Sequence, residues 1–415
     1  MMRVVIIGGG TAGTEVARQL RFKDKSVEID LVDKKGFDQL SPCSLPYYIE
    51  EIVEEEDLKV YNSYEEDGIN YYRGFKLEEY KDGRALIADV SEKKELSYDK
   101  LVIAMGSEAL IPDIKGLKDF YVLKDLEDAR KLKGISGRTL IIGGGYIGVE
   151  LASALKGEVF IAESKPYLFP RVLDRDMSKE VERYLREKNI NVFTSCEVKS
   201  FNGKSTVING EEVSFDNVIV SVGFKPNDVF TNGVVDEYLR VNEDVYCVGD
   251  LVKSKNEVTG EIENCMLANN AVKQAGIVAE NILGGSKRYD GFVSNSVSKV
   301  GNLIVGSTGI TSEKSKEVSG KVVVGKFKGI SKYKSCNGKE LTAKIICDDS
   351  GVIVGCQVIG FEDVAGRLNL ASSYIKNKQK AQDLVDIDTC YNPCTADMHD
   401  PLVQAGKVVI KKMVR

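Results

Sequence analysis

The chain has 415 residues, of which 43% are hydrophobic and 29% charged, and its formal net charge is −6 at pH 7. Domains usually hold roughly 100 to 200 residues, so a chain of this length predicts more than one hydrophobic core, and we expect three domains. The charge pattern lacks the basic patch of a nucleic-acid-binding protein, and the longest apolar runs are strand-length, well short of the ~20 residues of a membrane span.

Cysteine and histidine usage limits the chemistry further. The nine cysteines are an odd number and form no Cys-x-x-Cys pair, which argues against a secreted disulfide framework and favours a reducing compartment. We therefore expect a cytoplasmic protein. The one histidine, His399, excludes a His-rich metal site and makes a Ser-His or Cys-His catalytic pair improbable, so no metal is expected.

The sequence begins with a nucleotide-binding pattern. A strand (4–7), a glycine turn (8–13), a helix (about 14–22) and a strand (27–32) predict a βαβ unit with a parallel sheet. The turn fits G-x-G-x-x-G with Gly8, Gly10 and Gly13, which let backbone N–H groups approach a pyrophosphate at a helix N-terminus. Asp33 ends the second strand, where a carboxylate can hold a ribose hydroxyl.

A second copy of this pattern follows about 135 residues later. A strand (139–142) leads into Gly143, Gly145 and Gly148, then a helix to about 155 and a strand (159–162). Glu163 ends that strand and favours NADH over NADPH, because its carboxylate suits an unphosphorylated ribose. Lys165 and Arg171 follow closely and leave NADPH open. Tyr146, inside the loop, is a candidate gate for the nicotinamide pocket.

The chain changes character after the second unit. Pro112 and residues 241–245 are the expected crossing points between domains. From about residue 289, four strand-like runs (299–305, 321–327, 341–347 and 352–359) precede a helix from about residue 362. This block has no glycine-rich loop, so it is not a third nucleotide site.

Five motifs occur in a recognisable order: the two glycine loops, Leu101-Val102-Ile103-Ala104-Met105-Gly106-Ser107 between them, and then Val220-Ser221-Val222-Gly223-Phe224-Lys225-Pro226-Asn227 and Val245-Tyr246-Cys247-Val248-Gly249-Asp250. Over essentially the whole chain this order resembles the pyridine nucleotide-disulfide oxidoreductases. The resemblance implies that the first site binds FAD, that the second binds NAD(P)H, and that Asp250 contacts the ribityl chain of the flavin. Met105 departs from the usual threonine.

The same resemblance implies the architecture. We expect an α/β fold with two Rossmann-like domains and a C-terminal α+β dimerisation domain. The expected limits are 1–112 with 244–288 for the FAD-binding domain, 113–243 for the NAD(P)H-binding domain and 289–415 for the dimerisation domain. A helix from Leu267 to Leu283 should point its positive N-terminus at the flavin. The further cofactor-binding candidates are Ala104, Gly106, Gly223, Gly249, Leu267 and Ala268.

Cys43 is the candidate redox thiol. It lies in Ser41-Pro42-Cys43-Ser44-Leu45-Pro46-Tyr47-Tyr48 at the start of a predicted helix, where the helix N-terminus favours the nucleophilic thiolate. A small buried cysteine is the alternative interpretation. One cysteine followed by Leu-Pro-Tyr resembles coenzyme A-disulfide reductases, NADH oxidases and peroxidases, and persulfide or sulfur reductases, although Gln39 stands where a serine is often found.

The C-terminal block resembles the same subgroup. Tyr391, in Asp386-Ile387-Asp388-Thr389-Cys390-Tyr391-Asn392-Pro393, matches a tyrosine that reaches the thiol pocket of the partner subunit, which implies a homodimer. Packing is the alternative role for Tyr391. Cys390 and Cys394 are either spectators or a resolving thiol. Arg18, Arg21 and Lys23 form either a solvated face or a phosphate-binding cluster like that of the coenzyme A enzymes.

These expectations combine into one function with several electron acceptors left open. We expect an FAD-dependent NAD(P)H oxidoreductase that reduces a low-molecular-weight disulfide, persulfide or polysulfide, coenzyme A-linked in one version, through Cys43. The alternatives are an NADH oxidase or peroxidase acting on oxygen or peroxide, a reductase for a ferredoxin- or rubredoxin-type protein, and a flavin-bound redox sensor. No nucleic-acid or membrane partner is expected.

Overall fold

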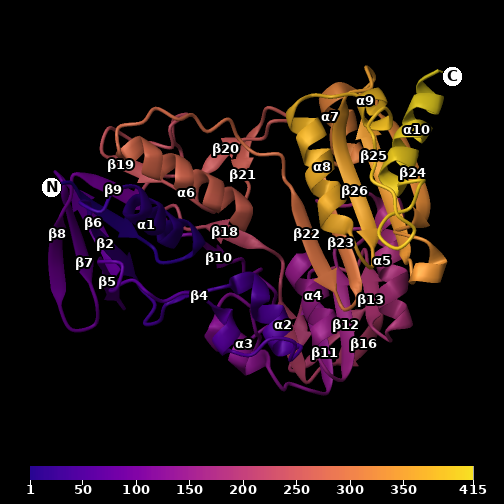
Figure 1. The fold of residues 1–415 in the computed structure, drawn as a ribbon. Helices are drawn as coiled ribbons and strands as arrows, with labels where there is room; N and C mark the ends of the chain where they lie inside the picture. Colours follow the sequence, from indigo (N-terminus) through magenta and orange to yellow (C-terminus); the bar gives the residue numbers. More distant parts are fainter. Residues whose placement is uncertain (415) are drawn as a thin grey trace. The chain divides into compact units, whose positions relative to one another are not determined.

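The computed structural model describes residues 1–414 and divides them into two compact units (Figure 1). The first unit contains residues 1–109, 124–126 and 224–292, and the second contains residues 110–123, 127–223 and 293–414. The division into three domains with the limits given above remains a prediction. Among the helices that the structure describes, none has the length and apolar character needed to cross a membrane.

The first unit is built on a five-stranded parallel sheet with the order β19-β9-β1-β2-β5. Its strands alternate with helices because short, buried apolar runs precede segments of helical period. Helices α1 and α6 pack against each other. The bounds are β1 (Arg3–Ile7), α1 (Thr11–Lys23), β2 (Glu28–Asp33), β5 (Ile69–Arg73), β9 (Lys100–Ile103), β19 (Val245–Cys247) and α6 (Ala268–Ile282).

Smaller elements complete the first unit. One antiparallel sheet contains β6 (Lys76–Lys81), β7 (Arg84–Ala88) and β8 (Lys93–Ser97), and three strand pairs are β3 (Gln39–Leu40) with β4 (Lys59–Tyr61), β10 (Ser107–Ala109) with β18 (Phe224–Pro226), and β20 (Lys253–Lys255) with β21 (Ile262–Asn264). Between β3 and β4 lie the 3₁₀ turn η1 (Pro42–Ser44), the helix α2 (Leu45–Ile49) and the turn η2 (Glu56–Leu58).

The second unit contains a four-stranded parallel sheet with the order β13-β12-β11-β17. It repeats the strand–loop–helix–strand pattern of the first unit, as the second glycine motif predicts. The bounds are α3 (Leu126–Leu132), β11 (Arg138–Ile142), α4 (Tyr146–Ala154), β12 (Glu158–Glu163), α5 (Arg175–Glu187), β13 (Asn191–Thr194) and β17 (Asn217–Val220), with a small sheet of β14 (Phe201–Asn202), β15 (Ser205–Ile208) and β16 (Glu211–Ser214).

The C-terminal part of this unit is an antiparallel sheet with the order β22-β23-β26-β25-β24, against which α8 and α10 pack (Figure 1). The bounds are β22 (Ser296–Val300), β23 (Leu303–Gly309), α7 (Ser312–Ser319), β24 (Val323–Ile330), η3 (Lys334–Cys336), β25 (Glu340–Cys347), β26 (Ile353–Gly360), α8 (Val364–Lys376), α9 (Ala381–Val385) and α10 (Pro401–Met413).

Most predicted elements are confirmed with small shifts at their ends, but one prediction is wrong. The run 299–305 is not a single strand, because it spans the turn between β22 and β23, which pair through Val300 and Leu303. Gly301 has φ +57° there, a left-handed conformation that glycine adopts without steric cost. Helix α1 also begins three residues earlier than predicted, directly after Gly10.

Candidate functional site

The first glycine loop joins β1 to α1 with very little space around two of its glycines. A Cβ on Gly8, which has φ +111°, would lie 2.3 Å from the Ala104 carbonyl oxygen, and one on Gly13 would lie 1.9 Å from the Gly8 carbonyl oxygen. Gly10 differs, because a Cβ there would meet nothing within 4 Å. The loop is therefore packed tightly on one side and is open at Gly10, next to the first turn of a 13-residue helix.

Asp33 braces this loop. Its carboxylate accepts the backbone N–H of Gly9 and, at 2.7 Å, that of Lys35. A carboxylate has about four lone-pair positions, so these two bonds leave it able to accept a ribose hydroxyl. The sequence predicted the ribose role for Asp33 but not the bond to the loop.

The second loop repeats this geometry in the second unit. A Cβ on Gly143 would lie 2.5 Å from the Ser221 carbonyl oxygen, and one on Gly148 would lie 2.1 Å from the Gly143 carbonyl oxygen, whereas Gly145 has nothing within 4 Å. Gly223 also has open space around it. Both loops thus leave an opening at the second glycine of their motif, beside a helix N-terminus without a side-chain cap.

Glu163 takes the place of Asp33 in this second copy. Its Oε2 accepts the Gly144 N–H at 2.7 Å, and its Oε1 accepts the Lys165 N–H at 2.7 Å. The Glu163 side chain is 7% exposed. Asp33 and Glu163 therefore each accept two backbone N–H groups, one of them from the glycine loop of their own unit.

Tyr146 and Glu150, on successive turns of α4, contact β22 within the second unit. The Tyr146 hydroxyl lies 2.6 Å from the Ser296 hydroxyl, and Ser298 donates a 2.6 Å hydrogen bond to the Glu150 carboxylate. Burial raises the pKa of Glu150 to about 7 and that of Tyr146 to about 12. Glu150 was not among the residues predicted from the sequence, although its spacing of four residues from Tyr146 places both side chains on one helix face.

Asp250 lies in a polar group that the sequence motifs identified only in part. Ser107 donates to its Oδ2 at 2.6 Å, and the Lys124 ammonium lies 3.2 Å from the Ser107 hydroxyl. Burial lowers the pKa of Lys124, and the charge of Asp250 acts in the opposite direction. Lys124 was not predicted, because the chain enters the first unit there for only residues 124–126.

The loop after β19 is held by α6. Gly249, at φ +86°, donates its N–H to the Oε1 of the buried Gln274 at 2.7 Å. Leu267 is the N-cap of α6 and Ala268 its first residue, and no side chain caps the helix there.

Ala104 is buried, and its N–H donates to the Ile7 carbonyl. Gly106 accepts a bond from the Asn227 N–H at 2.9 Å. The first glycine loop, Ala104 with Gly106, and Gly249 therefore follow the ends of the adjacent strands β1, β9 and β19, whereas Asp33 ends β2 and Leu267 and Ala268 begin α6.

Cys43 is exposed and lies in the middle of the turn η1. The helix expected to begin there is only the five-residue α2, which starts at Leu45. The Ser44 hydroxyl donates to the Ser41 hydroxyl at 2.8 Å, so two serines flank the cysteine. The Ser41 N–H donates to the Leu58 carbonyl at 2.8 Å, which fixes the start of the turn.

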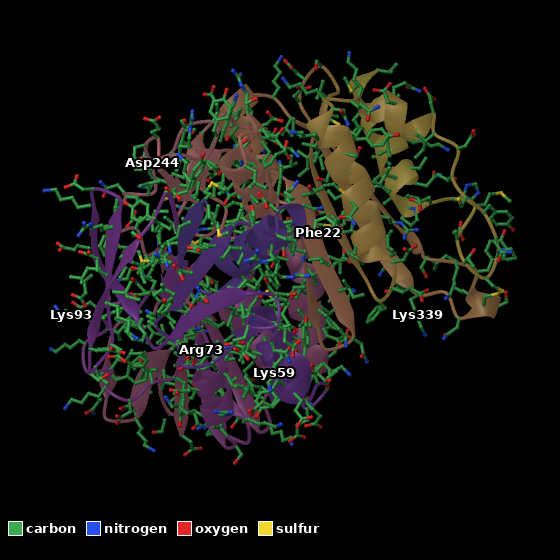
Figure 2. The ribbon with its side chains drawn as sticks, turned by 60° about the vertical axis from the view of Figure 1, so that its left-hand side comes forward. Phe22, Lys59, Arg73, Lys93, Asp244 and Lys339 are labelled. Carbon is green, nitrogen blue, oxygen red and sulfur yellow. A yellow bond between two sulfur atoms is a disulfide. The ribbon has the colours of Figure 1, made fainter. Side chains whose placement is uncertain are left out.

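A buried tyrosine connects this segment to the first glycine loop. The hydroxyl of Tyr64 lies 3.2 Å from that of Thr14 and 3.3 Å from the Gln39 nitrogen, and Thr14 donates to the Gly9 carbonyl at 3.1 Å. The guanidinium carbon of Arg73, which is labelled in Figure 2, lies 4.2 Å from the centre of the neighbouring Tyr71 ring. Polar contacts therefore run from Gly9 to the strand that precedes Cys43.

The basic cluster of α1 divides into two kinds of residue. Arg21 is 9% exposed and donates to the carbonyl oxygens of Lys25, Val27 and Gly68 at 2.7, 2.9 and 2.9 Å. Arg18 and Lys23 are exposed. The Arg18 guanidinium lies 5.2 Å from the centre of the Tyr61 ring. Arg18 and Lys23 thus reach solvent, and Arg18 also forms an ion pair with Glu15 at 3.1 Å.

Tyr391 is exposed and donates to the hydroxyl of Tyr333 at 3.1 Å. Its neighbour Cys394 forms a disulfide with Cys336, 58 residues away, whereas Cys390 is a free, exposed thiol. The sequence left Cys390 and Cys394 as spectators or a resolving thiol, and its spacing gave no sign of the bond between Cys394 and Cys336. Within residues 1–414, no cluster of three or more His, Cys, Asp or Glu side chains could hold a metal ion.

Both glycine loops fit a dinucleotide. Each has an opening where a Cβ would project freely, an uncapped helix N-terminus and an acid at the end of the next strand. These are the features that admit a pyrophosphate and hold the ribose.

Comparison with known proteins agrees with this geometry. Residues 2–275 match the family described as pyridine nucleotide-disulphide oxidoreductase, and residues 296–401 match its dimerisation domain, which indicates a homodimer. A protein from Methanocaldococcus jannaschii named NADH oxidase is 30% identical over 449 residues, with 99% of each chain covered. An NAD(P)H sulfur oxidoreductase (CoA-dependent) from Pyrococcus furiosus is 26% identical over 443 residues, covering 98% of this chain and 99% of that protein.

A solved structure extends the comparison to the fold. The NAD-dependent persulfide reductase from A. fulgidus matches with a TM-score of 0.93 at 29% identity, over 99% of this chain and 83% of that chain. The order of motifs, the two glycine loops and these matches lead to one conclusion. The chain belongs to the pyridine nucleotide-disulphide oxidoreductase family and is an oxidoreductase that uses FAD and NAD(P)H.

Proposed function

We propose that this enzyme transfers electrons from NAD(P)H to a low-molecular-weight disulfide, persulfide or polysulfide through Cys43. The observation that carries the proposal is the position of Cys43, exposed in η1 four residues after Gln39, whose N–H contacts the Tyr64 hydroxyl beside Thr14 of the first glycine loop's helix. A thiol that only filled space would be buried, as Cys247, Cys347 and Cys356 are.

We assign FAD to the loop of Gly8, Gly10 and Gly13, with Asp33 on the ribose and Asp250 on the ribityl chain. Ala104, Gly106, Gly249, Leu267 and Ala268 complete this assignment. NAD(P)H is assigned to the loop of Gly143, Gly145 and Gly148, with Glu163, Tyr146 and Gly223. FAD held by these residues would supply two-electron chemistry between NAD(P)H and a thiol.

The residues of the chain supply the sulfur chemistry. The Cys43 thiolate attacks one sulfur of the substrate, a mixed disulfide forms at Cys43, and the other half of the substrate leaves as a thiolate. Two electrons then restore the Cys43 thiolate and release the second thiol. Tyr391 of the partner subunit donates a proton to a departing thiolate, a general-acid role worth roughly 10²- to 10⁴-fold in rate.

Charge on α1 favours an anionic substrate such as coenzyme A disulfide. Arg18 lies over Tyr61, and Tyr61 pairs with Gln39, four residues before Cys43. Lys23 is exposed and so is Arg18, which pairs with Glu15 at the surface, whereas the guanidinium of Arg21 is occupied by three carbonyl oxygens. We therefore assign the phosphates to Arg18 and Lys23, and Arg21 to the support of α1. The Pyrococcus relative named as CoA-dependent supports this choice.

Two disulfides that share the pantetheine arms test the assignment. Pantethine keeps the disulfide of coenzyme A disulfide but lacks its phosphates together with the adenosine that carries them. Arg18→Ala and Lys23→Ala should raise the KM for coenzyme A disulfide by about tenfold per lost charge contact and leave the KM for pantethine unchanged. Equal effects on both disulfides would contradict the assignment.

Oxygen is a second candidate acceptor, because the Methanocaldococcus jannaschii protein that is 30% identical to this chain is named NADH oxidase. One experiment decides between the sulfur acceptors and oxygen or peroxide. It measures steady-state oxidation of NADH and NADPH with coenzyme A disulfide, polysulfide, oxygen and hydrogen peroxide side by side. The proposal expects the sulfur acceptors to give the highest kcat/KM. Turnover with oxygen or peroxide alone would assign the chain to the oxidases, with Cys43 passing through a sulfenic acid.

A further inference from the structure

We propose that Lys344 is a positioning residue for the nicotinamide cofactor. Its ammonium holds residues 164–174, here called the β12–α5 segment, and this segment orients the second glycine loop. Lys344 lies in β25, in the part of the chain that matches a dimerisation domain, whereas the loop lies between β11 and α4. All of these elements belong to the second compact unit. The proposal rests on the assignment of NAD(P)H to the second loop and does not depend on which acceptor the enzyme reduces.

In both loops the carbonyl of the glycine before the open position accepts a hydrogen bond, but from different parts of the chain. In the first loop the Thr14 hydroxyl donates to the Gly9 carbonyl at 3.1 Å. The residue that directly follows the last glycine of the second loop is Val149, which has no hydroxyl to donate. The Gly144 carbonyl instead accepts the Phe169 N–H at 2.9 Å. The second loop therefore takes from the β12–α5 segment a bond that the first loop takes from its own helix.

The bond from Phe169 sets the direction of a backbone donor. A trans peptide is planar, so the Gly144 carbonyl and the Gly145 N–H point in opposite directions. When the Phe169 N–H holds the carbonyl, the Gly145 N–H is fixed on the opposite side of the peptide. Backbone N–H groups between such a loop and its helix are the groups that bind a pyrophosphate. A shift of Phe169 would therefore turn a donor that the cofactor needs.

Phe169 has an unusual backbone conformation. Its φ is +53°, which a bulky residue rarely adopts and which persists only where the surroundings determine it. Phe169 is buried, and its ring lies 5.2 Å, centre to centre, from the Tyr146 ring. Its carbonyl accepts the N–H groups of Val172 and Leu173, both at 2.9 Å. The segment thus forms a tight turn that leads directly into Asp174.

Asp174 anchors this turn to the C-terminal part of the unit. Its N–H donates to the Oε1 of Gln357 in β26 at 2.9 Å, and its Oδ1 accepts the Ser312 N–H at 2.9 Å. Its Oδ2 lies 2.7 Å from the Lys344 ammonium, and the two side chains are only 6% and 7% exposed. A buried carboxylate is stable when a charge of opposite sign is paired with it. Lys344 is therefore the counter-charge that keeps Asp174, and with it the turn, in place.

A neighbouring lysine provides a matched control. Lys326 lies opposite Lys344 on β24 and pairs with Asp176 at 3.2 Å and with Glu180 at 2.9 Å. Lys344 pairs with Asp176 as well, so the two lysines share a partner on α5. The difference is Asp174, whose carboxylate contacts Lys344. Loss of either lysine removes positive charge from beside α5, but loss of Lys344 also releases the β12–α5 segment.

The first test measures reduction of the bound flavin by NADH in a stopped-flow instrument, without an acceptor. Lys344→Met should raise the Kd for NADH roughly tenfold, as expected for one misplaced hydrogen-bond donor to a charged group, and should leave the limiting rate of flavin reduction unchanged. Lys326→Met should keep the wild-type Kd. A wild-type Kd in Lys344→Met, or an equal rise in both variants, would overturn the proposal.

A second variant separates positioning from stability, because a buried carboxylate that loses its partner can unfold a protein. Asp174→Asn/Lys344→Met removes both charges and leaves no uncompensated ion between them. It should unfold near the wild-type temperature and still show the raised Kd for NADH, since the ion pair is missing. Recovery of the Kd together with the unfolding temperature would show that Lys344 acts on stability alone, and the proposal would fall.

Amide hydrogen exchange follows the β12–α5 segment itself. The Phe169 amide should exchange roughly tenfold or more faster in Lys344→Met and in the double variant than in the wild type. Exchange in β1 of the first unit should be the same in every protein, and Lys326→Met should match the wild type at Phe169. Equal protection of the Phe169 amide in Lys344→Met and the wild type would contradict the route through this residue.

Gly145→Val separates the proposal from the assignment on which it rests. If NADH reduces the flavin of Gly145→Val with the wild-type Kd, the assignment of NAD(P)H to the second loop fails, and the cofactor role of Lys344 fails with it. If Gly145→Val loses this reduction while Lys344→Met keeps the wild-type Kd, the assignment stands and the role of Lys344 fails alone. Loss of reduction in Gly145→Val together with a raised Kd in Lys344→Met is the result that the proposal expects.

Discussion

The hydroxyl of Ser107 donates a hydrogen bond of 2.6 Å to the carboxylate of Asp250, although the two residues are 143 positions apart in the chain. This bond fixes the carboxylate that we assign to the ribityl chain of FAD. Asp250→Ala should raise the dissociation constant for FAD roughly 10- to 100-fold, since hydrogen bonds to charged groups contribute about 1.5–3 kcal/mol. Titration of the apoprotein with FAD measures this. Glu243→Ala, at an exposed acid nearby, is the control, and equal affinities would remove Asp250 from the site.

The open position at the second glycine of each loop gives a matched pair of variants. Gly10→Val and Gly145→Val should both fold, because each added side chain projects into open space and the backbone φ is −78° or −81°. Gly10→Val should lose FAD, whereas Gly145→Val should keep FAD and lose reduction by NAD(P)H. Absorbance of the bound flavin and its bleaching by NADH measure both. Full flavin content in Gly10→Val would contradict the assignment of the first loop.

Glu163 is proposed to select NADH, and its bond to Gly144 determines how to test that. Glu163→Ala would remove the brace of the loop together with the charge, whereas Glu163→Gln keeps an oxygen acceptor for the Gly144 N–H. Glu163→Gln should lower the ratio of kcat/KM for NADH over NADPH by about tenfold, or about 1.4 kcal/mol. An unchanged ratio, or a wild type that already prefers NADPH, would show that Glu163 does not discriminate.

The stability of the second unit should depend on the proton of Glu150. Burial raises the pKa of this carboxyl from 4.5 to about 7 in the folded chain. Because the folded pKa is the higher one, this contribution to stability is fully present below about pH 4.5 and is lost as the pH rises towards 7. Glu150→Gln should therefore gain relative stability between pH 5 and 8, by up to about 3 kcal/mol.

Thermal unfolding of the FAD-loaded proteins at pH 5, 6, 7 and 8 measures this difference. Glu211→Gln, at an exposed glutamate of the same unit, is the control and should follow the wild type at every pH. A difference between Glu150→Gln and the wild type that does not change with pH would show that Glu150 titrates normally.

The sequence predicts the two nucleotide-binding units well because their signal is local. Each strand, glycine turn and helix lies within about 25 consecutive residues, and the steric need for Gly8 and Gly13 is readable from the motif. The structure adds what the pattern does not contain, namely that Asp33 and Glu163 accept loop N–H groups as well as being placed for a ribose.

Other features depend on contacts between distant segments and could not be predicted. The Cys336–Cys394 bond joins residues 58 positions apart. Lys124 contacts Ser107 because the chain returns to the first unit for residues 124–126. The three basic residues of α1 look alike in the sequence, yet Arg21 is turned inward because the carbonyl oxygens of Lys25, Val27 and Gly68 are within its reach.

The central claim is that Cys43 carries electrons from the flavin to a sulfur acceptor, and Cys43→Ser tests it most directly. The variant should keep FAD, because the first glycine loop and Asp250 are unchanged, and NADH should reduce its flavin at the wild-type rate. Its steady-state turnover with coenzyme A disulfide or polysulfide should fall to the background rate. The measurement is a stopped-flow record of flavin reduction beside steady-state acceptor turnover, with Cys390→Ser as the matched control. Wild-type turnover of the sulfur acceptors in Cys43→Ser would contradict the account.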